Sequence, residues 1–126
     1  MGVSMDASGL GSLVADLRRA AVEAPRKSRQ AVEVSARKIK DDARERAAGA
    51  LFTPHYPRSI TYDVFGSGSG AFAEIGPYPG GPQWGLGNIL EFGTPRNAPR
   101  PHLGPALEAE APDFERVLGD IAKGVL

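Results

Sequence analysis

The sequence contains no cysteine, few aromatic residues and no long apolar run. Without cysteine there is no disulfide framework, no Cys-ligated zinc site and no thiol nucleophile. No segment approaches the roughly 18 apolar residues that a membrane span needs, and the N-terminus lacks the basic-then-apolar pattern of a signal peptide. We therefore expect one domain, 1–126, made in a reducing cytoplasm. The 16 Gly and 11 Pro among 126 residues predict long ordered loops.

Net charge is zero, but the charges are unevenly distributed. Residues 1–50 hold ten Lys/Arg against seven Asp/Glu, whereas residues 101–126 hold two against five. One interpretation is a pair of solvated helix faces. The other is that a basic helix of one copy meets an acidic helix of the next in a head-to-tail ring. A globally basic DNA-binding protein is disfavoured in either case.

Two apolar stripes at helical spacing predict a long N-terminal helix over residues 10–48. Pro25 lies between them and either kinks a single helix or opens a second one. Residues 1–8 are expected to be flexible. The second stripe is mostly alanine, which buries little area, so we expect a partner subunit to add stability. The stripe positions are Leu10, Leu13, Val14, Leu17 and Ala21, then Val32, Ala36, Ile39, Ala43 and Ala47.

The rest of the chain predicts a small sheet followed by a helix. Residues 59–65 and 71–75 are rich in β-branched and aromatic side chains and indicate a hairpin, and 89–92 indicates a third strand. A helix is expected over 105–123, with Pro112 as a kink or second start. The fold class is therefore α+β, with helices on one face of an antiparallel sheet of about three strands within residues 59–92. The exposed sheet edges would need a neighbouring subunit to cover them.

No constellation of residues indicates catalysis or metal binding. The two histidines, His55 and His102, are not at metal-ligand spacing, and no nucleophile-elbow motif is present. Both histidines are expected to be loop or helix-start residues. We accordingly predict no enzymatic activity, no metal and no cofactor.

The most informative segment is Glu91-Phe92-Gly93-Thr94 with the run Arg100 to Leu107 that follows it. Pro95, Pro99 and Pro101 fix φ and hold the backbone extended, so the loop loses little entropy when it docks. Glu91 could pair with Arg96 or Arg100 and pin this loop, or it could face solvent. The single tryptophan, Trp84, is either an interface anchor or part of the core.

The run E-F-G-T, a spacer and R-P-H-L-G-P-A-L resembles the signature of a tail-component family of long-tailed (siphovirus) phages. That family contains neck, head–tail joining and tail-completion proteins. Arg58-Ser59-Ile60 and Ala73-Glu74-Ile75-Gly76 are similar to its hairpin strands, and the order matches over roughly residues 10 to 115. His102 stands where the family commonly has Phe, and the segment 78–85 is longer and richer in Gly and Pro.

The resemblance implies a structural virion protein, either a ring-forming head–tail connector of the neck or a tail-completion or terminator protein. Six or twelve copies would bind one another and other neck and tail proteins, at the virion neck or upper tail. Packaged DNA would pass through the channel without sequence-specific binding, and no membrane is involved. The alternative is a small cytoplasmic interaction module that binds a helical partner. The candidate interface residues are Trp84, Glu91, Arg96, Arg100 and His102.

Overall fold

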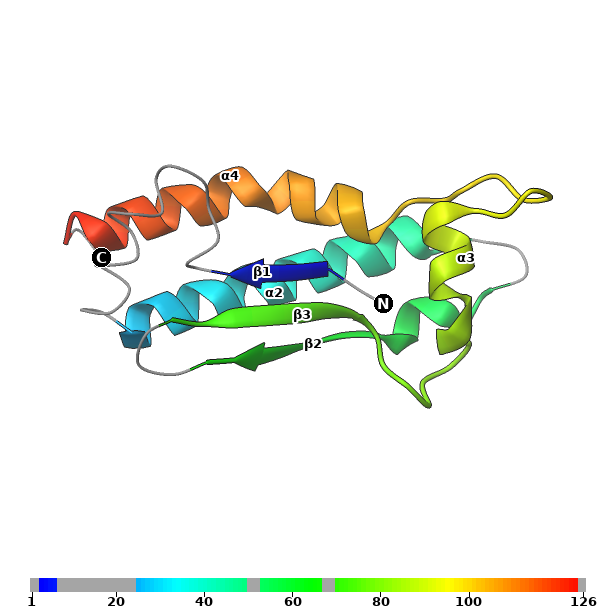
Figure 1. Ribbon diagram of the computed structural model, residues 1–126, viewed down its shortest axis with the longest axis horizontal. Helices are drawn as coiled ribbons and strands as arrows, with labels where there is room; N and C mark the ends of the chain where they lie inside the picture. The colour runs from blue at the N-terminus through cyan, green and yellow to red at the C-terminus, as the bar shows by residue number, and fades with distance from the viewer. Residues whose placement is uncertain (1–2, 7–24, 50–52, 67–69, 125–126) are drawn as a thin grey trace.

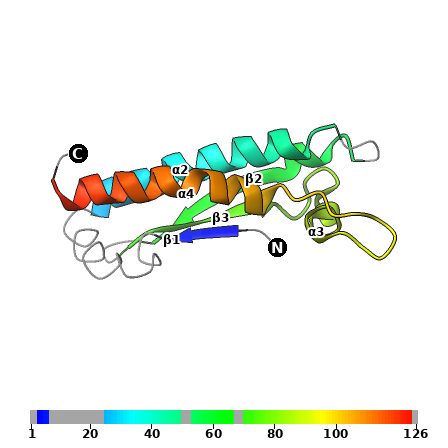
Figure 2. The same cartoon turned by 90° about the horizontal axis from the view of Figure 1, so that it is seen from above.

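The computed structural model describes residues 3–6, 25–49, 53–66 and 70–124. Two long helices, α2 (Pro25–Ala47) and α4 (Leu103–Ala122), run antiparallel and cover one face of a small sheet (Figures 1 and 2). The fold is α+β, as predicted, with the helices on one face. Among the described helices, none has both the length and the apolar character that a membrane crossing requires.

Helix α2 presents a stripe of small and β-branched side chains to the core. Val32, Ala36, Ile39 and Ala43 are all completely buried, as the alanine-rich periodicity predicts. Short side chains let α4 and the sheet approach the same helix closely. After Ala47 the chain leaves the helix through Gly49, whose φ of +84° is a conformation that favours glycine.

The hairpin consists of β2 (Ile60–Phe65) and β3 (Phe72–Pro77), paired antiparallel from Ile60↔Pro77 to Phe65↔Phe72. Both predicted hairpin strands are confirmed. Side chains alternate between the two faces, so Ile60 and Ile75 are buried while Asp63 and Glu74 are exposed.

The N-terminal predictions require a correction. Residues 1–8 were expected to be flexible, but Val3–Asp6 form β1, which pairs antiparallel with β3 and gives the sheet order β1-β3-β2. The predicted helix over 10–48 is confirmed from Pro25 onward. The segment 10–24, and with it the question of a kink near Pro25, lies outside the described residues.

The third predicted strand is wrong, because Ile89–Phe92 belong to a short helix, α3 (Gly87–Phe92). A four-residue run with three apolar side chains does not distinguish a strand from a helix. In α3 the 3.6-residue period turns Leu90 and Glu91 inward and leaves Ile89 and Phe92 exposed. The sheet therefore contains two of the three predicted strands.

The C-terminal helix is confirmed, beginning two residues before the predicted start. It continues through Pro112, which is exposed, so neither a break nor a second start is needed there. Its buried side chains pack against the α2 stripe and the sheet to form one core; they include Leu103, Ala106, Phe114, Leu118 and Ile121.

Candidate functional site

Glu91 caps the N-terminus of α4 from a distant part of the sequence. Its Oε1 accepts hydrogen bonds from the backbone N–H groups of His102 (3.1 Å) and Leu103 (2.8 Å), and its Oε2 accepts one from Gly104 (3.2 Å). The first N–H groups of a helix have no partner within the helix, and a carboxylate there also interacts favourably with the helix dipole. The E-F-G-T motif thus supplies the acid that starts the C-terminal helix.

His102 connects this cap to the opposite wall of the core. Its Nδ1 lies 3.1 Å from both the Glu91 carboxylate and the Arg100 carbonyl oxygen, and its Nε2 lies 2.8 Å from the Tyr56 hydroxyl. Because both neighbours of Nδ1 are acceptors, Nδ1 is a ring nitrogen that carries a proton and donates it to them. The two rings also meet edge to face at 5.3 Å.

Burial and charge shift the pKa values of this cluster in opposite directions. Burial alone would raise the pKa of Glu91, but the three backbone N–H groups of Leu103, His102 and Gly104, with a contribution from the His102 charge, hold it below the usual value. Burial, and secondarily the charge of Glu91, raises the pKa of Tyr56. Glu91 is therefore ionised and Tyr56 neutral at neutral pH.

The order Tyr56–His102–Glu91 resembles a proton relay, but its position gives it a structural role. Tyr56 and His102 are both 0% exposed. A substrate could not contact them without opening the core. Across the described parts of the chain, no group of three acidic or histidine side chains could hold a metal ion. What the cluster does is fix α3, α4 and the Tyr56–Ser59 3₁₀ helix relative to one another.

A rigid loop, residues 93–102, joins α3 to α4, and we call it the strap. At Gly93, φ is +74°, and a Cβ would lie 2.8 Å from both the Asn97 oxygen and the Pro99 nitrogen. Glycine is therefore required. The Arg100 N–H donates to the Leu90 carbonyl at 2.6 Å, and the Arg100 guanidinium donates to the Ala48 carbonyl oxygen near the end of α2.

The five predicted interface residues separate into two groups. Glu91 and His102 are buried, so they stabilise the fold and their side chains do not reach a partner directly. Neither of the roles considered for Glu91, an arginine pair or a solvent-facing carboxylate, is the one observed. Trp84, Arg96 and Arg100 lie on the surface, which excludes Trp84 from the core.

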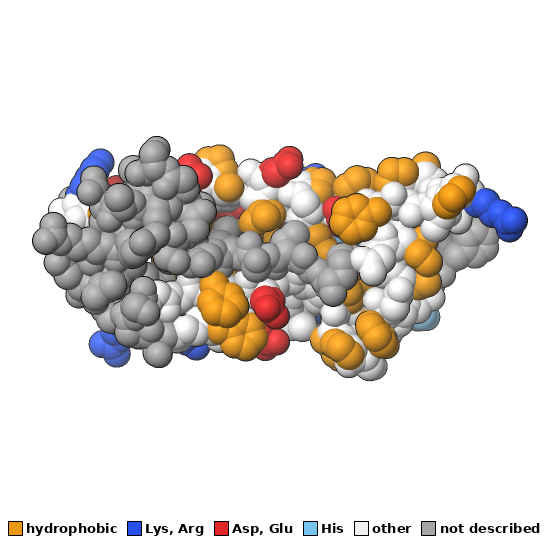
Figure 3. Space-filling view, in the orientation of Figure 1, with side chains coloured by type: hydrophobic (Ala, Val, Ile, Leu, Met, Phe, Trp, Pro, Cys, Tyr) orange, Lys and Arg blue, Asp and Glu red, His pale blue; other side chains and the backbone are white. Residues whose placement is uncertain are grey.

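Among the described residues, six of the seven exposed large apolar side chains lie on the hairpin, in the loop that follows it or on α3, and the seventh, Val34, lies on α2. On the face drawn in Figure 3, apolar groups lie over the hairpin at one end and over α3 and its preceding loop at the other. We call this the apolar face and define it by Phe65, Phe72, Tyr78, Trp84, Ile89 and Phe92. Phe92 is the most exposed at 71%. Phe92 therefore does not pack into the core of the subunit.

On the hairpin, the apolar face combines aromatic and acidic pairs. The Phe65 and Phe72 rings stack at 5.2 Å, and the directly paired Asp63 and Glu74 are both exposed. Like charges opposite one another destabilise a sheet, so this pair adds nothing to the fold. No Lys or Arg is present between residues 60 and 77 to offset the two carboxylates.

The free edge of β2 is covered by arginines of the same chain. Arg44 donates twice to the Ile60 carbonyl, at 2.9 and 2.6 Å, and Arg29 donates to the Gly66 and Val64 carbonyls at 2.8 and 3.4 Å. A neighbouring subunit is therefore not needed to satisfy these carbonyl groups, contrary to expectation. The sequence analysis missed both arginines, although their spacing of 15 residues, close to four helical turns, places them on one side of α2.

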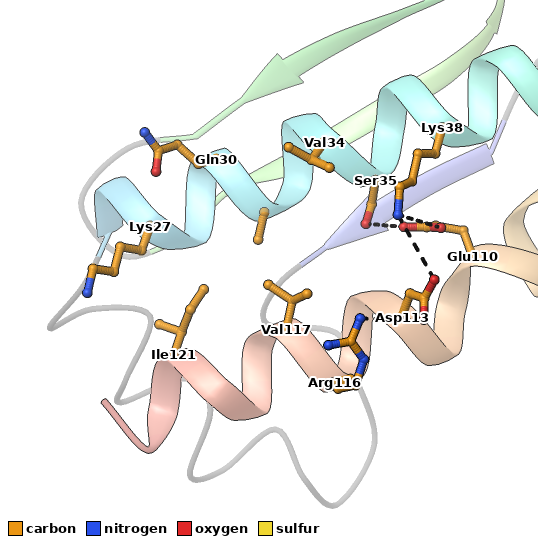
Figure 4. Close-up of a pocket in the computed structure, with 11 residues that line it drawn as sticks. Lys27, Gln30, Val34, Ser35, Lys38, Glu110, Asp113, Arg116, Val117 and Ile121 are labelled. Carbon is orange, nitrogen blue, oxygen red and sulfur yellow. Dashed lines mark hydrogen bonds and ion pairs between the residues drawn. The ribbon is translucent and has the colours of Figure 1, made fainter. Parts of the chain in front are cut away.

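A groove of about 340 Å³ separates the N-terminal half of α2 from the C-terminal half of α4 (Figure 4). Charged groups rim one end of it, where Lys38 lies 3.8 Å from Glu110 and 4.0 Å from Asp113. Beneath them, the Ser35 hydroxyl donates to Glu110 at 2.7 Å. The complete lining is Lys27, Gln30, Ala31, Val34, Ser35, Lys38, Glu110, Asp113, Arg116, Val117 and Ile121.

Comparisons of the chain with protein-family models, with curated proteins and with solved structures found no match.

Proposed function

We propose that the chain is a structural subunit of a tailed phage or prophage particle, forming a ring at the head–tail junction as a neck connector or tail-completion protein. The resemblance of the E-F-G-T and R-P-H-L-G-P-A-L segments to the phage tail-component signature supports the setting. The arrangement of exposed and buried residues supports the role of an assembly subunit.

The observation that carries the proposal is the apolar face. Exposed patches of large apolar side chains mark interaction sites, and this face carries two, one at the hairpin and one over α3 and its preceding loop. Five of its six members are Trp, Tyr or Phe residues at the hairpin end, in the loop and on α3, and aromatic residues are enriched at the centres of interfaces. The face is built on paired strands and a capped helix arrangement, which fix its geometry before a partner arrives.

The strap and the Glu91 cap support the same role. Burying a carboxylate to hold three N–H groups, with His102 and Tyr56 behind it, fixes the angle between α3 and α4. The prolines of the strap add stiffness. A subunit that must repeat around a ring benefits from such a fixed angle, because small errors accumulate from copy to copy.

The test begins with the mass of the full-length chain. Native mass spectrometry and sedimentation velocity from micromolar to millimolar concentration should show a closed multimer, six or twelve copies by the resemblance. Phe92→Ser and Trp84→Ser should lower its abundance. Glu115→Ser, an exposed change on α4 outside the apolar face, is the matched control. A monomer throughout this range would contradict ring formation by the free chain.

Location in the particle is the second part of the test. Antibody-labelled electron microscopy of particles from the phage or prophage that encodes the chain should place label at the neck or upper tail. Label at another site, or particles without the chain, would contradict the proposed function.

The alternative, a small module that binds a helical partner, has one observation in its favour. The α2–α4 groove has an apolar floor and a charged rim, a combination that suits an amphipathic helix. A chain that stays monomeric and is missing from the particle would favour this alternative.

A further inference from the structure

We propose that the ring contact is a hairpin-in-groove joint, in which Phe65 and Phe72 of one copy seat in the α2–α4 groove of the next. This inference rests on the proposed ring and names the two surfaces that would form it. Each copy carries both surfaces on different layers, so the joint is heterologous and can repeat from copy to copy.

The groove offers an apolar floor of suitable shape. Its apolar lining consists of Ala31, Val34, Val117 and Ile121, and Figure 4 shows Val34 on α2 and Val117 and Ile121 on α4. Val34 is 43% exposed although it is β-branched and apolar, so a covering group would remove its surface from water. The volume of about 340 Å³ lies at the small end of the range for specific pockets, which fits a pair of rings better than a whole helix.

The hairpin end offers the matching apolar group. Phe65 and Phe72 are stacked on each other, about 40% exposed, and held by paired strands. They point away from their own α2, because the alternate positions Val64 and Ala73 face it. These rings therefore cannot fill the groove of their own chain, which lies between the two helices on the other layer (Figures 1 and 2).

Complementary charge indicates that the occupant of the groove is a second copy of the chain. The outer hairpin surface carries Asp63 and Glu74 with no Lys or Arg between residues 60 and 77. Residues 25–49, which contain α2, hold eight Lys/Arg against four Asp/Glu, a net charge of +4. The groove lining itself holds Lys27, Lys38 and Arg116 against Glu110 and Asp113, a net charge of +1. Docking would bring the two unsupported carboxylates to this basic helix, and electrostatic complementarity of this kind fixes the orientation of partners.

Engineered disulfides test the joint directly, because the native chain contains no cysteine. Val34→Cys combined with Phe72→Cys places one thiol in the groove and one on the hairpin, both at exposed positions. Mild oxidation of the full-length double variant should give a ladder of disulfide-linked multimers. The control pair, Val34→Cys with Thr61→Cys at the opposite end of β2, should give no ladder.

Charge reversal provides an independent readout. Glu74→Lys should weaken self-association about tenfold, and adding Lys27→Glu in the same chain should restore it, since the two residues would meet across the joint. Circular dichroism should be unchanged, because both residues are exposed. If reversal at either site leaves self-association unchanged, the joint is wrong.

The remaining outcomes separate this inference from the proposed function. Multimers that form normally while the Val34/Phe72 pair fails to cross-link would overturn the joint and leave the ring intact. A monomer under every condition would overturn both. A disulfide between Leu13→Cys and Val34→Cys within one chain would show that the chain's own N-terminal segment occupies the groove, and would overturn the joint as well.

Discussion

The two ends of the α2–α4 helix pair differ in how closely their polar side chains are packed and hydrogen-bonded. At the end where α4 begins, Glu91, His102 and Tyr56 are buried and linked by hydrogen bonds, and Arg100 satisfies a carbonyl at the end of α2. At the other end the same helices separate into an open groove whose rim carries lysine, arginine, aspartate and glutamate side chains. We call these the closed end and the open end.

The difference shows how one helix pair can serve both stability and association. A buried polar network stabilises the fold only when all its members have partners, and at the closed end they do. At the open end Lys38 and Asp113 are exposed, so their ion pairs, at 3.8 Å to Glu110 and 4.0 Å between Lys38 and Asp113, contribute little, while Glu110 is buried and accepts a hydrogen bond from Ser35. Stability is concentrated at one end, and the other remains available to a partner.

The largest expected effect comes from removing the cap at the closed end. Glu91→Ala should lower the free energy of unfolding by about 3–5 kcal/mol, because it leaves buried N–H groups and the His102 ring without their hydrogen-bond acceptor. Glu91→Gln keeps one acceptor oxygen and should cost about half as much. Chemical denaturation followed by circular dichroism measures both. If Glu91→Ala lowered the free energy of unfolding by less than about 1 kcal/mol, the Glu91 cap would not be the main source of stability at the closed end.

A matched pair of truncations compares the apolar packing of the two ends. Leu103→Ala removes a side chain that is 1% exposed and should cost about 2–5 kcal/mol, whereas Val34→Ala at the open groove should cost less than about 1 kcal/mol. Urea denaturation of the two variants at equal, low protein concentration checks the difference. Similar costs would mean that the groove is filled in the free chain.

Acid should weaken the closed end selectively. The pKa of Glu91 is lower in the folded chain than in the unfolded chain, so its stabilisation is complete above the unfolded value of about 4.3 and is lost as the pH falls through the folded value. The difference in unfolding free energy between wild type and Glu91→Gln should therefore be constant from neutral pH to about 5 and shrink below about 4. A difference that persists unchanged to pH 2 would contradict this.

The smallest expected effect on stability is at the apolar face. Phe92→Ser should change the free energy of unfolding by no more than about 0.5 kcal/mol, because the ring is 71% exposed. Self-association should nevertheless decrease. Thermal unfolding and sedimentation velocity on the same sample check both. A large loss of stability would mean that Phe92 packs within the subunit after all.

Several elements were predictable because their signals are local. The alanine stripe of α2, the β-branched hairpin strands and the apolar period of α4 each reflect the burial of one face, and each was found. The run Ile89–Phe92 was not, because so short a run with three apolar residues fits either a strand or a turn of helix. The strand at the sheet edge, Val3–Asp6, was also missed, because its partner residues on β3 lie 66 to 72 positions further along the chain.

The roles of individual polar residues depended on the tertiary structure. The motif identified Glu91 as important, but only the approach of α3 to α4 shows that its carboxylate meets three N–H groups 11 to 13 residues further on. Tyr56, between two prolines, gave no signal at all. Arg96 and Arg100 were expected near Glu91, whereas the Arg100 side chain reaches Ala48, 52 residues earlier in the sequence.

By itself, then, the sequence determined the class of fold, the places where the chain turns and the segment that would be rigid, because these follow from side-chain periodicity and from the restricted φ of proline and freedom of glycine. Only the tertiary structure decided which charges are buried, which sheet edge is covered and where an apolar face remains. Those outcomes depend on contacts between residues far apart in sequence, and local pattern carries no information about the distance between them.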